Sequence, residues 1–232
     1  MGIQERKIRE KEQRKLHIIN AGEKLFLKKG LENTKMDEIA KACELSKGTL
    51  YLYFRSKEEL YLTIILKAMG VLYEMMQDYS LKATNPLDKF RAINEAYLVY
   101  YKKFPNYFNI ITHFVDHRLL KEKLEIQDVL NEIYKVNNQI WDFITKIISE
   151  CVNKGYINNK VKPIELAVIM WTSSNGMLQF MDHIKNEQQC QEDGAFLAFG
   201  FDCEDMMRKT WDIILSAVLI NKTKKNKKTL EA

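Results

Sequence analysis

The sequence predicts an all-α protein, and three observations support this prediction. Three prolines and nine glycines in 232 residues leave few positions at which a helix must stop. Apolar residues recur at spacings of three and four along most of the chain, which is the period of one helical face. Apolar residues make up 46% of the chain, enough for one large or two small hydrophobic cores.

The first predicted helix runs from residue 3 to about residue 30. Its first half is charged almost throughout, with six basic and three acidic side chains between residues 5 and 15. Its second half carries an apolar stripe that includes Ile18, Ile19, Leu25 and Phe26. Gly30 is the expected C-cap glycine of this helix.

Residues 34 to 54 predict two short helices joined by a tight turn. Thr34 is expected to cap the first helix, with Asp37 three positions later as the acidic member of a capping box. The turn falls at Glu44 and Leu45, and Ser46 is expected to cap the second helix through its hydroxyl. The buried residues are expected to be Met36, Ile39, Ala40 and Cys43 in the first helix, and Leu50 and Phe54 in the second.

The outward side of the second short helix lacks the carboxylates that an ordinary surface helix would carry. Gly48 allows close approach of a backbone, Lys47 and Thr49 can contact base edges, and tyrosine hydroxyls can reach phosphates. Lys57 begins the next predicted helix, which Ser56 is expected to cap. The free backbone N–H groups at the start of this helix attract anions. The pattern predicts a helix that enters the major groove of DNA. The candidate DNA-binding residues are Lys35, Ser46, Lys47, Gly48, Thr49, Tyr51, Tyr53 and Lys57.

The segment from residue 34 to residue 60 resembles the helix-turn-helix of the TetR family of bacterial one-component repressors. The matching residues are Ile39-Ala40, Leu45 to Tyr51, Tyr53-Phe54 and Ser56 to Leu60. Glu44 departs from the family pattern, which usually has glycine there, and a positive φ would strain a non-glycine residue. The resemblance implies a homodimer whose larger C-terminal domain encloses an effector and whose last two long helices pair across the dimer.

The chain is expected to divide into three parts. Residues 1–60 form the helix-turn-helix DNA-binding domain, with the motif at about 35–54, and residues 61–221 form a helical effector-binding and dimerisation domain. Residues 222–232 form a basic disordered tail. The helix that begins at Lys57 is expected to continue to about residue 79 and to belong to both domains. Further helices are expected over 86–104, 105–120, 122–155, 163–184 and 202–221. Gly155 is expected to end the helix over 122–155, and a loop is expected over 185–194.

The helices between residues 86 and 155 are rich in aromatic side chains. Such side chains can be ordinary core, but as a set they favour an apolar pocket with tyrosine hydroxyls as polar handles. The candidate pocket residues are Tyr97, Tyr101, Phe104, Phe108, His113, His117, Trp141, Met177 and Phe180. The two histidines, four residues apart, lack a third ligand and do not predict a metal site. The candidate dimer-interface residues are Ile169, Ser173, Gly176, Trp211, Ile214 and Val218.

Charge and composition narrow the function classes. Residues 1–60 hold 14 basic and 10 acidic side chains, residues 221–232 hold five and one, and the middle of the chain is net negative. Basic ends favour a partner that carries phosphates. The four scattered cysteines predict neither a zinc site nor a disulfide framework. No catalytic motif or glycine-rich phosphate loop is present, so we expect no enzyme and no cofactor, and without a signal peptide or a membrane span we expect a cytoplasmic protein.

The sequence therefore predicts a sequence-specific DNA-binding transcriptional regulator. We expect a ligand-released repressor that binds a palindromic operator as a homodimer and responds to a hydrophobic or aromatic small molecule. The alternative is a dimeric regulator with no small-molecule effector, controlled by a protein partner or by its own level. The basic first half of the first helix is either a solvated arm or an arm that lies along DNA.

Overall fold

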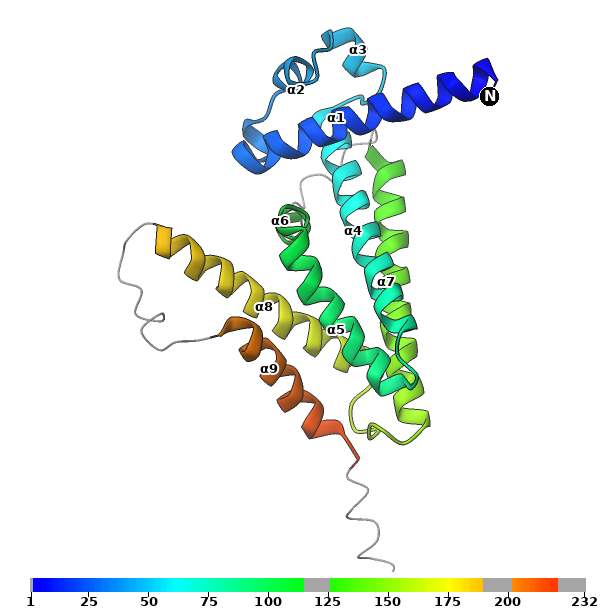
Figure 1. Cartoon of the computed structure of the whole chain (residues 1–232), viewed down its shortest axis with the longest axis vertical. Coiled ribbons are helices and arrows are strands. Elements are labelled where there is room, and N and C mark those ends of the chain that lie inside the picture. The colour runs from blue at the N-terminus through cyan, green and yellow to red at the C-terminus, as the bar shows by residue number, and fades with distance from the viewer. Residues whose placement is uncertain (1, 115–125, 190–201, 221–232) are drawn as a thin grey trace, which may run out of the picture. The chain divides into compact units, whose positions relative to one another are not determined.

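The computed structural model describes residues 2–114, 126–189 and 202–220. Within these ranges the protein is helical, apart from one isolated antiparallel bridge between Ile157 and Leu219. The predicted all-α fold is confirmed. Figure 1 shows the helices α1 (Ile3–Asn33), α2 (Met36–Ala42), α3 (Lys47–Tyr51), α4 (Lys57–Leu81), α5 (Pro86–Lys103), α6 (Pro105–Phe114), α7 (Gln127–Asn153), α8 (Pro163–Gln189) and α9 (Cys203–Val218).

The chain forms two compact units. Unit 1 comprises residues 1–75 and 100–139, and unit 2 comprises residues 76–99 and 140–232. The helices α4, α5 and α7 each begin in one unit and end in the other. The boundary that the sequence suggested after residue 60 thus falls inside α4, and unit 1 also contains the next turns of that helix. The basic tail predicted for residues 222–232 lies outside the described residues.

The core of unit 1 joins α1 to α4 with α6. Its most deeply buried side chains are no more than 2% exposed: Ile18, Ile39, Leu50, Phe54, Leu60, Ile64 and Phe108. At Gly22 a Cβ would lie only 2.7 Å from Cδ2 of Leu60, so glycine lets α1 and α4 approach closely. The buried Tyr100 hydroxyl donates to the carbonyl oxygen of Ala68 at 3.0 Å, which fixes α5 against α4 within this unit.

In unit 2, α8 and α9 pack against each other (Figure 1). The indole N–H of Trp211 donates to the Ser174 hydroxyl at 2.7 Å in a buried bond that links the two helices. The Arg208 guanidinium binds both carboxylate oxygens of Glu95, at 2.8 and 3.1 Å, and so ties α9 to α5. In unit 2, α9 is therefore linked to α8 and to α5 by side-chain hydrogen bonds.

Several predicted helix ends are confirmed and others are corrected. Gly155 has a φ of 69°, the conformation that glycine adopts without strain where a helix ends, and it follows the end of α7 as predicted. Gly30, with a φ of 74°, instead kinks α1, which ends three residues later at Asn33 with Thr34 as its C-cap, so the predicted C-cap is corrected. The loop predicted for residues 185–194 is wrong in its first part, because residues 185–189 belong to α8, and residues 190–194 lie outside the described residues. Lysine, glutamate and glutamine are good helix formers, so nothing in that stretch breaks the helix.

Candidate nucleic-acid interface

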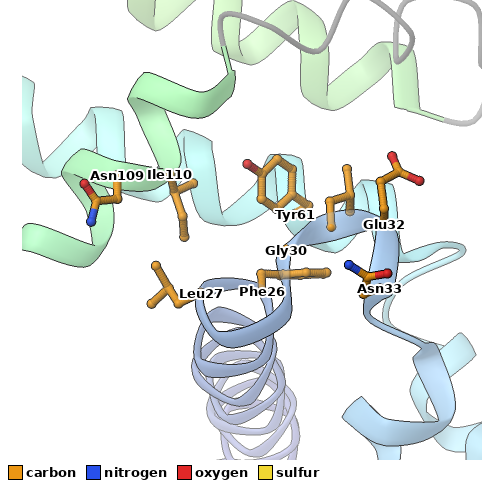
Figure 2. Close-up of a pocket in the computed structure, with 9 residues that line it drawn as sticks. Phe26, Leu27, Gly30, Glu32, Asn33, Tyr61, Asn109 and Ile110 are labelled. Carbon is orange, nitrogen blue, oxygen red and sulfur yellow. The ribbon is translucent and has the colours of Figure 1, made fainter. Parts of the chain in front are cut away.

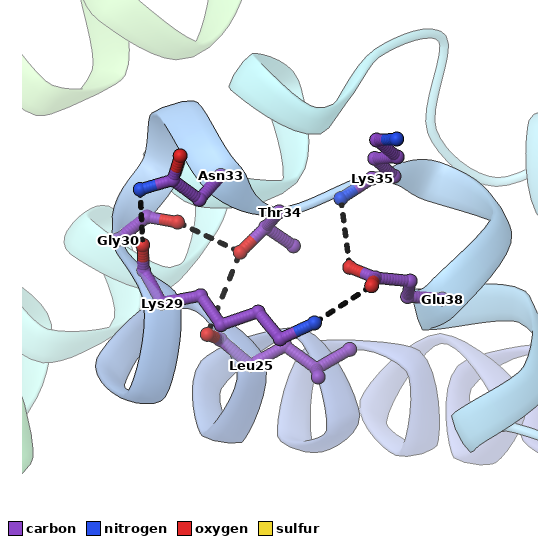
Figure 3. Close-up of polar contacts among 7 residues, drawn as sticks. All are labelled: Leu25, Lys29, Gly30, Asn33, Thr34, Lys35 and Glu38. Atoms are coloured by element: carbon purple, nitrogen blue, oxygen red, sulfur yellow. Dashed lines mark hydrogen bonds and ion pairs between the residues drawn. The ribbon is translucent and has the colours of Figure 1, made fainter.

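The junction between α1 and α2 is built around a buried threonine (Figure 3). Thr34 is fully buried, and its hydroxyl donates to the carbonyl oxygens of Gly30, at 2.7 Å, and Leu25, at 3.4 Å. Its hydroxyl therefore faces back to α1, and the prediction that Thr34 caps the following helix is wrong. The N-cap of α2 is Lys35, since the helix begins one residue later than the capping box at Thr34 and Asp37 requires.

An acidic residue in the first turn of α2 holds its start to α1 (Figure 3). Glu38 accepts a hydrogen bond from the backbone N–H of Lys35 at 3.3 Å and from the Lys29 ammonium at 2.7 Å. These two bonds, the one from Lys29 first, lower the pKa of the Glu38 carboxyl. The capping carboxylate is thus Glu38 rather than Asp37, and the cap also anchors the helix-turn-helix to α1.

The turn and the second short helix form as the sequence predicts. Glu44 has a φ of 55°, the left-handed conformation expected where related sequences have glycine. The Ser46 hydroxyl accepts from the backbone N–H of Thr49 at 3.1 Å and is 2.8 Å from its hydroxyl, so Ser46 is confirmed as the N-cap of α3. Leu50 and Phe54 are buried as expected.

The opposite side of α3 is open to solvent. Lys47, Gly48 and Tyr51 are exposed, while Thr49 and Tyr53 are half-buried. A Cβ at Gly48 would meet only the Ser46 hydroxyl, at 3.9 Å, so this side of α3 has room for another molecule. The helix itself carries no carboxylate, as its sequence KGTLY shows.

The lysine at the start of α3 has an acidic neighbour in α2. Its ammonium lies 2.7 Å from a carboxylate oxygen of Asp37, and more than half of each side chain is exposed. The hydrogen bond and the charge of Asp37 raise the pKa of Lys47. An exposed pair of this kind contributes little to stability, so Lys47 can exchange its partner.

The lysine at the start of α4 is held differently. The Lys57 ammonium donates to the carbonyl oxygens of Leu31, at 2.8 Å, and Glu32, at 2.9 Å, at the end of α1. The Ser56 hydroxyl accepts from the backbone N–H of Glu59 at 3.1 Å, which confirms the predicted cap of α4. Since an ammonium group has three N–H donors, one of those of Lys57 is left for an anion.

A pocket of about 400 Å³ opens within unit 1 beside the end of α1 (Figure 2). Phe26 and Tyr61 meet edge to face in it, with ring centroids 5.2 Å apart. The lining residues are Phe26, Leu27, Gly30, Leu31, Glu32, Asn33, Tyr61, Asn109 and Ile110. None of these was a predicted pocket residue, because the lining joins residues that are up to 84 positions apart and no local pattern brings them together.

The residues predicted for an effector pocket occur in both units. In unit 1, Tyr101 and Phe108 pack edge to face with centroids 5.0 Å apart, and Phe104 stacks on Tyr107. The side chain of His113 and the whole of His117 lie outside the described part of the chain.

In unit 2, the Tyr97 hydroxyl donates to the Asn175 side chain at 3.3 Å, and burial raises the pKa of the tyrosine. Trp141 packs edge to face against Trp171, with centroids 5.9 Å apart. Met177 is half-buried and Phe180 is 40% exposed. Whether these residues, together with those of unit 1, serve a ligand stays a prediction.

The residues predicted for the dimer interface divide by exposure. Ile169 and Gly176 are exposed, while Ser173 and Ile214 are half-buried. Trp211 and Val218 are only 5% and 6% exposed within one protomer. These last two are therefore mainly core residues of unit 2 that leave little surface for a partner.

The described residues hold no group of three or more histidine, cysteine, aspartate or glutamate side chains placed to bind a metal ion. Among the described helices, none combines the length and the apolar character needed to cross a membrane.

Comparison with known proteins places the helix-turn-helix in a family. Residues 18–64 match the family described as "Bacterial regulatory proteins, tetR family". The HTH-type transcriptional regulator YhgD of Bacillus subtilis is 30% identical over 151 residues, which cover 62% of this chain and 72% of that protein. The chain belongs to the TetR family. It is a helix-turn-helix transcription regulator with an all-helical fold.

Two further comparisons show how far the likeness of this TetR-family chain extends. The B. subtilis regulator YuxN is 38% identical over 81 residues, but the match spans only 28% of that protein. The structure of FadR from B. subtilis, solved in complex with stearoyl-CoA, has a TM-score of 0.65 and 19% identity. That match covers 87% of this chain and 97% of FadR, and it supports the fold alone.

Proposed function

We propose that the protein binds a palindromic DNA operator in a sequence-specific manner and regulates transcription from it as a homodimer. The observation that carries the proposal is the open face of α3, which presents Lys47, Gly48 and Tyr51 to solvent without a carboxylate of its own. A helix in the major groove needs such a face, because carboxylates on it would repel phosphates.

Seven of the eight candidate DNA-binding residues receive a role in DNA contact from their position, and Ser46 caps α3. Lys47 and Thr49 lie on the first turn and contact base edges, whereas Gly48 keeps the backbone close to them. Phosphates are contacted by the tyrosine hydroxyls of α3 and its C-terminal turn, by Lys35 and by Lys57, which opens α4.

A second copy of the chain is proposed to pack on α8 and α9. Apolar side chains stand exposed on these helices within the protomer: Ile164, Val168, Ile169 and Phe180 on α8, and Ile213 on α9. Exposed apolar residues that gather on one pair of helices favour a protein interface. Two α3 helices related by a two-fold axis would then read successive major grooves of a palindrome.

The proposed effector is a small molecule with a long apolar part. The aromatic residues of α5 to α7 and Met177 suit an apolar ligand better than a sugar. FadR, which shares the fold, was solved with stearoyl-CoA, so a long-chain acyl-CoA is the first compound to test. Ligand binding would bias the far part of α4, whose first residue contacts α1, and release the operator. By linkage, operator DNA must weaken ligand binding by the same factor.

Selection of bound sequences from random duplex DNA tests the proposal. We expect the full-length protein to enrich a palindrome, and Lys47→Ala to change the bases enriched in each half-site. Lys57→Ala should instead weaken binding to all duplexes alike, because a phosphate contact carries no sequence information. No enriched sequence would contradict DNA recognition, and an unchanged sequence with Lys47→Ala would remove its role in base reading.

Titration of the selected duplex with stearoyl-CoA tests the effector. We expect stearoyl-CoA, but not free coenzyme A, to release the DNA, since the apolar chain supplies the binding energy. If the protein binds a palindrome and no apolar ligand releases it, control by a protein partner or by the level of the regulator takes its place.

A further inference from the structure

The N-terminal half of α1 carries a row of basic side chains on one side. Lys7, Lys11, Arg14 and Lys15 stand at positions i, i+4, i+7 and i+8 of a continuous helix. At 3.6 residues per turn, these four positions fall within an arc of about 100°. We call these four residues the basic stripe, and none of the acidic residues of this segment falls within its arc.

The charges outside the stripe balance one another more closely. Arg6 pairs with Glu10, with 2.9 Å between their side-chain atoms, and Glu5 and Glu12 lie on the face away from the stripe. All described side chains from residue 4 to residue 17 are exposed, so the rest of the described protomer leaves this part of α1 uncovered. The segregation of charge therefore serves no packing within the protomer.

One contact shows which way the basic stripe faces. The Lys15 ammonium lies 5.7 Å from the ring centroid of Phe54, three residues after the end of α3. The stripe is thus on the side of α1 that meets the helix-turn-helix. Figure 1 shows the first turns of α1 extending beyond α2 and α3, so the stripe continues away from the reading helix.

The length and polarity of the segment identify its partner. From Ile3 to Ile18, the first buried residue, α1 rises about 22 Å, a length over which each strand of B-DNA carries about six phosphates. Ile8 and Leu16 are exposed in this segment, but they lie apart from each other around the helix, and Glu5 and Glu12 are also on the face away from the stripe. The segment therefore has no continuous apolar face of the kind that a helix in a membrane or a protein groove requires, and a row of cations fits a phosphate backbone better.

We propose that the basic stripe of α1 binds phosphates of double-stranded DNA next to the base pairs that α3 contacts. This inference rests on the proposed function, since it requires the helix-turn-helix to hold an operator. The stripe adds affinity that is independent of sequence and falls steeply with salt, because each neutralised phosphate releases counterions.

A pair of charge-matched variants tests the proposal on the full-length protein. Lys7→Gln/Lys11→Gln removes two charges from the stripe, and Arg6→Gln/Arg9→Gln removes two charges of the same segment from outside it. Glutamine, lysine and arginine have similar helix propensities, so α1 should stay helical in both, as circular dichroism would verify. Binding to the selected operator, embedded in a longer duplex, is measured over a range of salt concentrations.

We expect the slope of log Kobs against log salt to become shallower by about 1.8 in the stripe variant, or about 0.9 for each phosphate that the variant no longer neutralises. The off-stripe variant should change the slope by less than half as much. Hydroxyl-radical footprinting should show protected sugars next to the half-site with the wild type, and their exposure with the stripe variant.

Equal slopes for the wild type and the stripe variant would overturn the proposal, as would equal effects of the two variants. A wild-type protein that enriches no DNA sequence would instead overturn the proposed function itself, so the two failures are distinguishable.

Discussion

Replacing Thr34 by valine tests the junction between α1 and α2. The hydroxyl of this fully buried residue donates to the carbonyl oxygen of Gly30 at 2.7 Å. The backbone N–H that would ordinarily bind that carbonyl, the one of Thr34 itself, turns to Leu31 at 3.4 Å instead. Valine keeps the shape and suits the extended backbone of residue 34, with φ −89° and ψ 135°, but it removes the donor.

The expected loss of folding stability in Thr34→Val follows from the Gly30 carbonyl oxygen, which is left without this donor. A typical hydrogen bond contributes about 0.5–1.5 kcal/mol net, and a buried group left without a partner costs about 1–3 kcal/mol. We therefore expect Thr34→Val to lower the free energy of unfolding by about 1–3 kcal/mol. Urea titration followed by circular dichroism should show a lower midpoint with the same slope, since the surface exposed on unfolding does not change.

A second pair of variants isolates the hydroxyl from the methyl group. Thr34→Ser and Thr34→Ala both lack the methyl, and they differ only in the hydroxyl. The alanine variant should be less stable than the serine variant by the same amount, about 1–3 kcal/mol. A valine variant as stable as the wild type, together with an alanine variant as stable as the serine variant, would refute the role of this bond.

Three further perturbations have defined signs. Glu44→Gly should stabilise the protein by about 0.5–1 kcal/mol, because relief of the strain at φ 55° outweighs the entropy of glycine in the unfolded chain, whereas Glu44→Ala should show no gain in urea unfolding. Ser174→Ala leaves the buried indole N–H of Trp211 without its acceptor at 2.7 Å and should cost about 1–3 kcal/mol, which an unchanged urea midpoint would contradict. Burial raises the pKa of Glu23, so the native state holds its proton more readily than the unfolded state just above pH 4.5. The wild type should therefore gain stability relative to Glu23→Gln as the pH falls from about 7 to about 5, and a constant difference would argue against this shift.

Local signals in the sequence were sufficient for much of the helix-turn-helix. The serines that cap α3 and α4 precede their helices by one residue, and Gly155 marks the end of α7 without any need for tertiary contacts. Leu50 and Phe54 are both buried, as their spacing of four predicts. In these cases the pattern and the contact that it predicts lie within one or two turns of the chain.

The predictions that failed, and the features that were missed, depend on contacts between distant segments. Thr34 looks like an N-cap in sequence, but its hydroxyl donates back to the carbonyl of Gly30, whose usual helical donor, the N–H of Thr34, turns to Leu31 instead. The bonds of Lys57 reach residues 25 and 26 positions away. The partner of Lys47 is a carboxylate on the preceding helix, placed by the geometry of the turn. No periodicity in the sequence encodes such pairs, since they require the packed arrangement of α1 to α4.

These partners give the two lysines of the proposed interface different energetic roles. Lys47 must leave Asp37 to contact a base, and because an exposed pair of this kind contributes little to stability, the exchange of partners costs little. In the proposed complex Asp37 would stay close to the DNA, and its charge would disfavour any register in which Lys47 lacks a strong acceptor. Lys57 keeps its two bonds to α1 and can add a phosphate with its third donor, so its side chain is ordered before DNA arrives. In the proposed complex we therefore expect Lys47, which must exchange partners, to discriminate between sequences, and Lys57, which need not, to supply affinity that is independent of sequence.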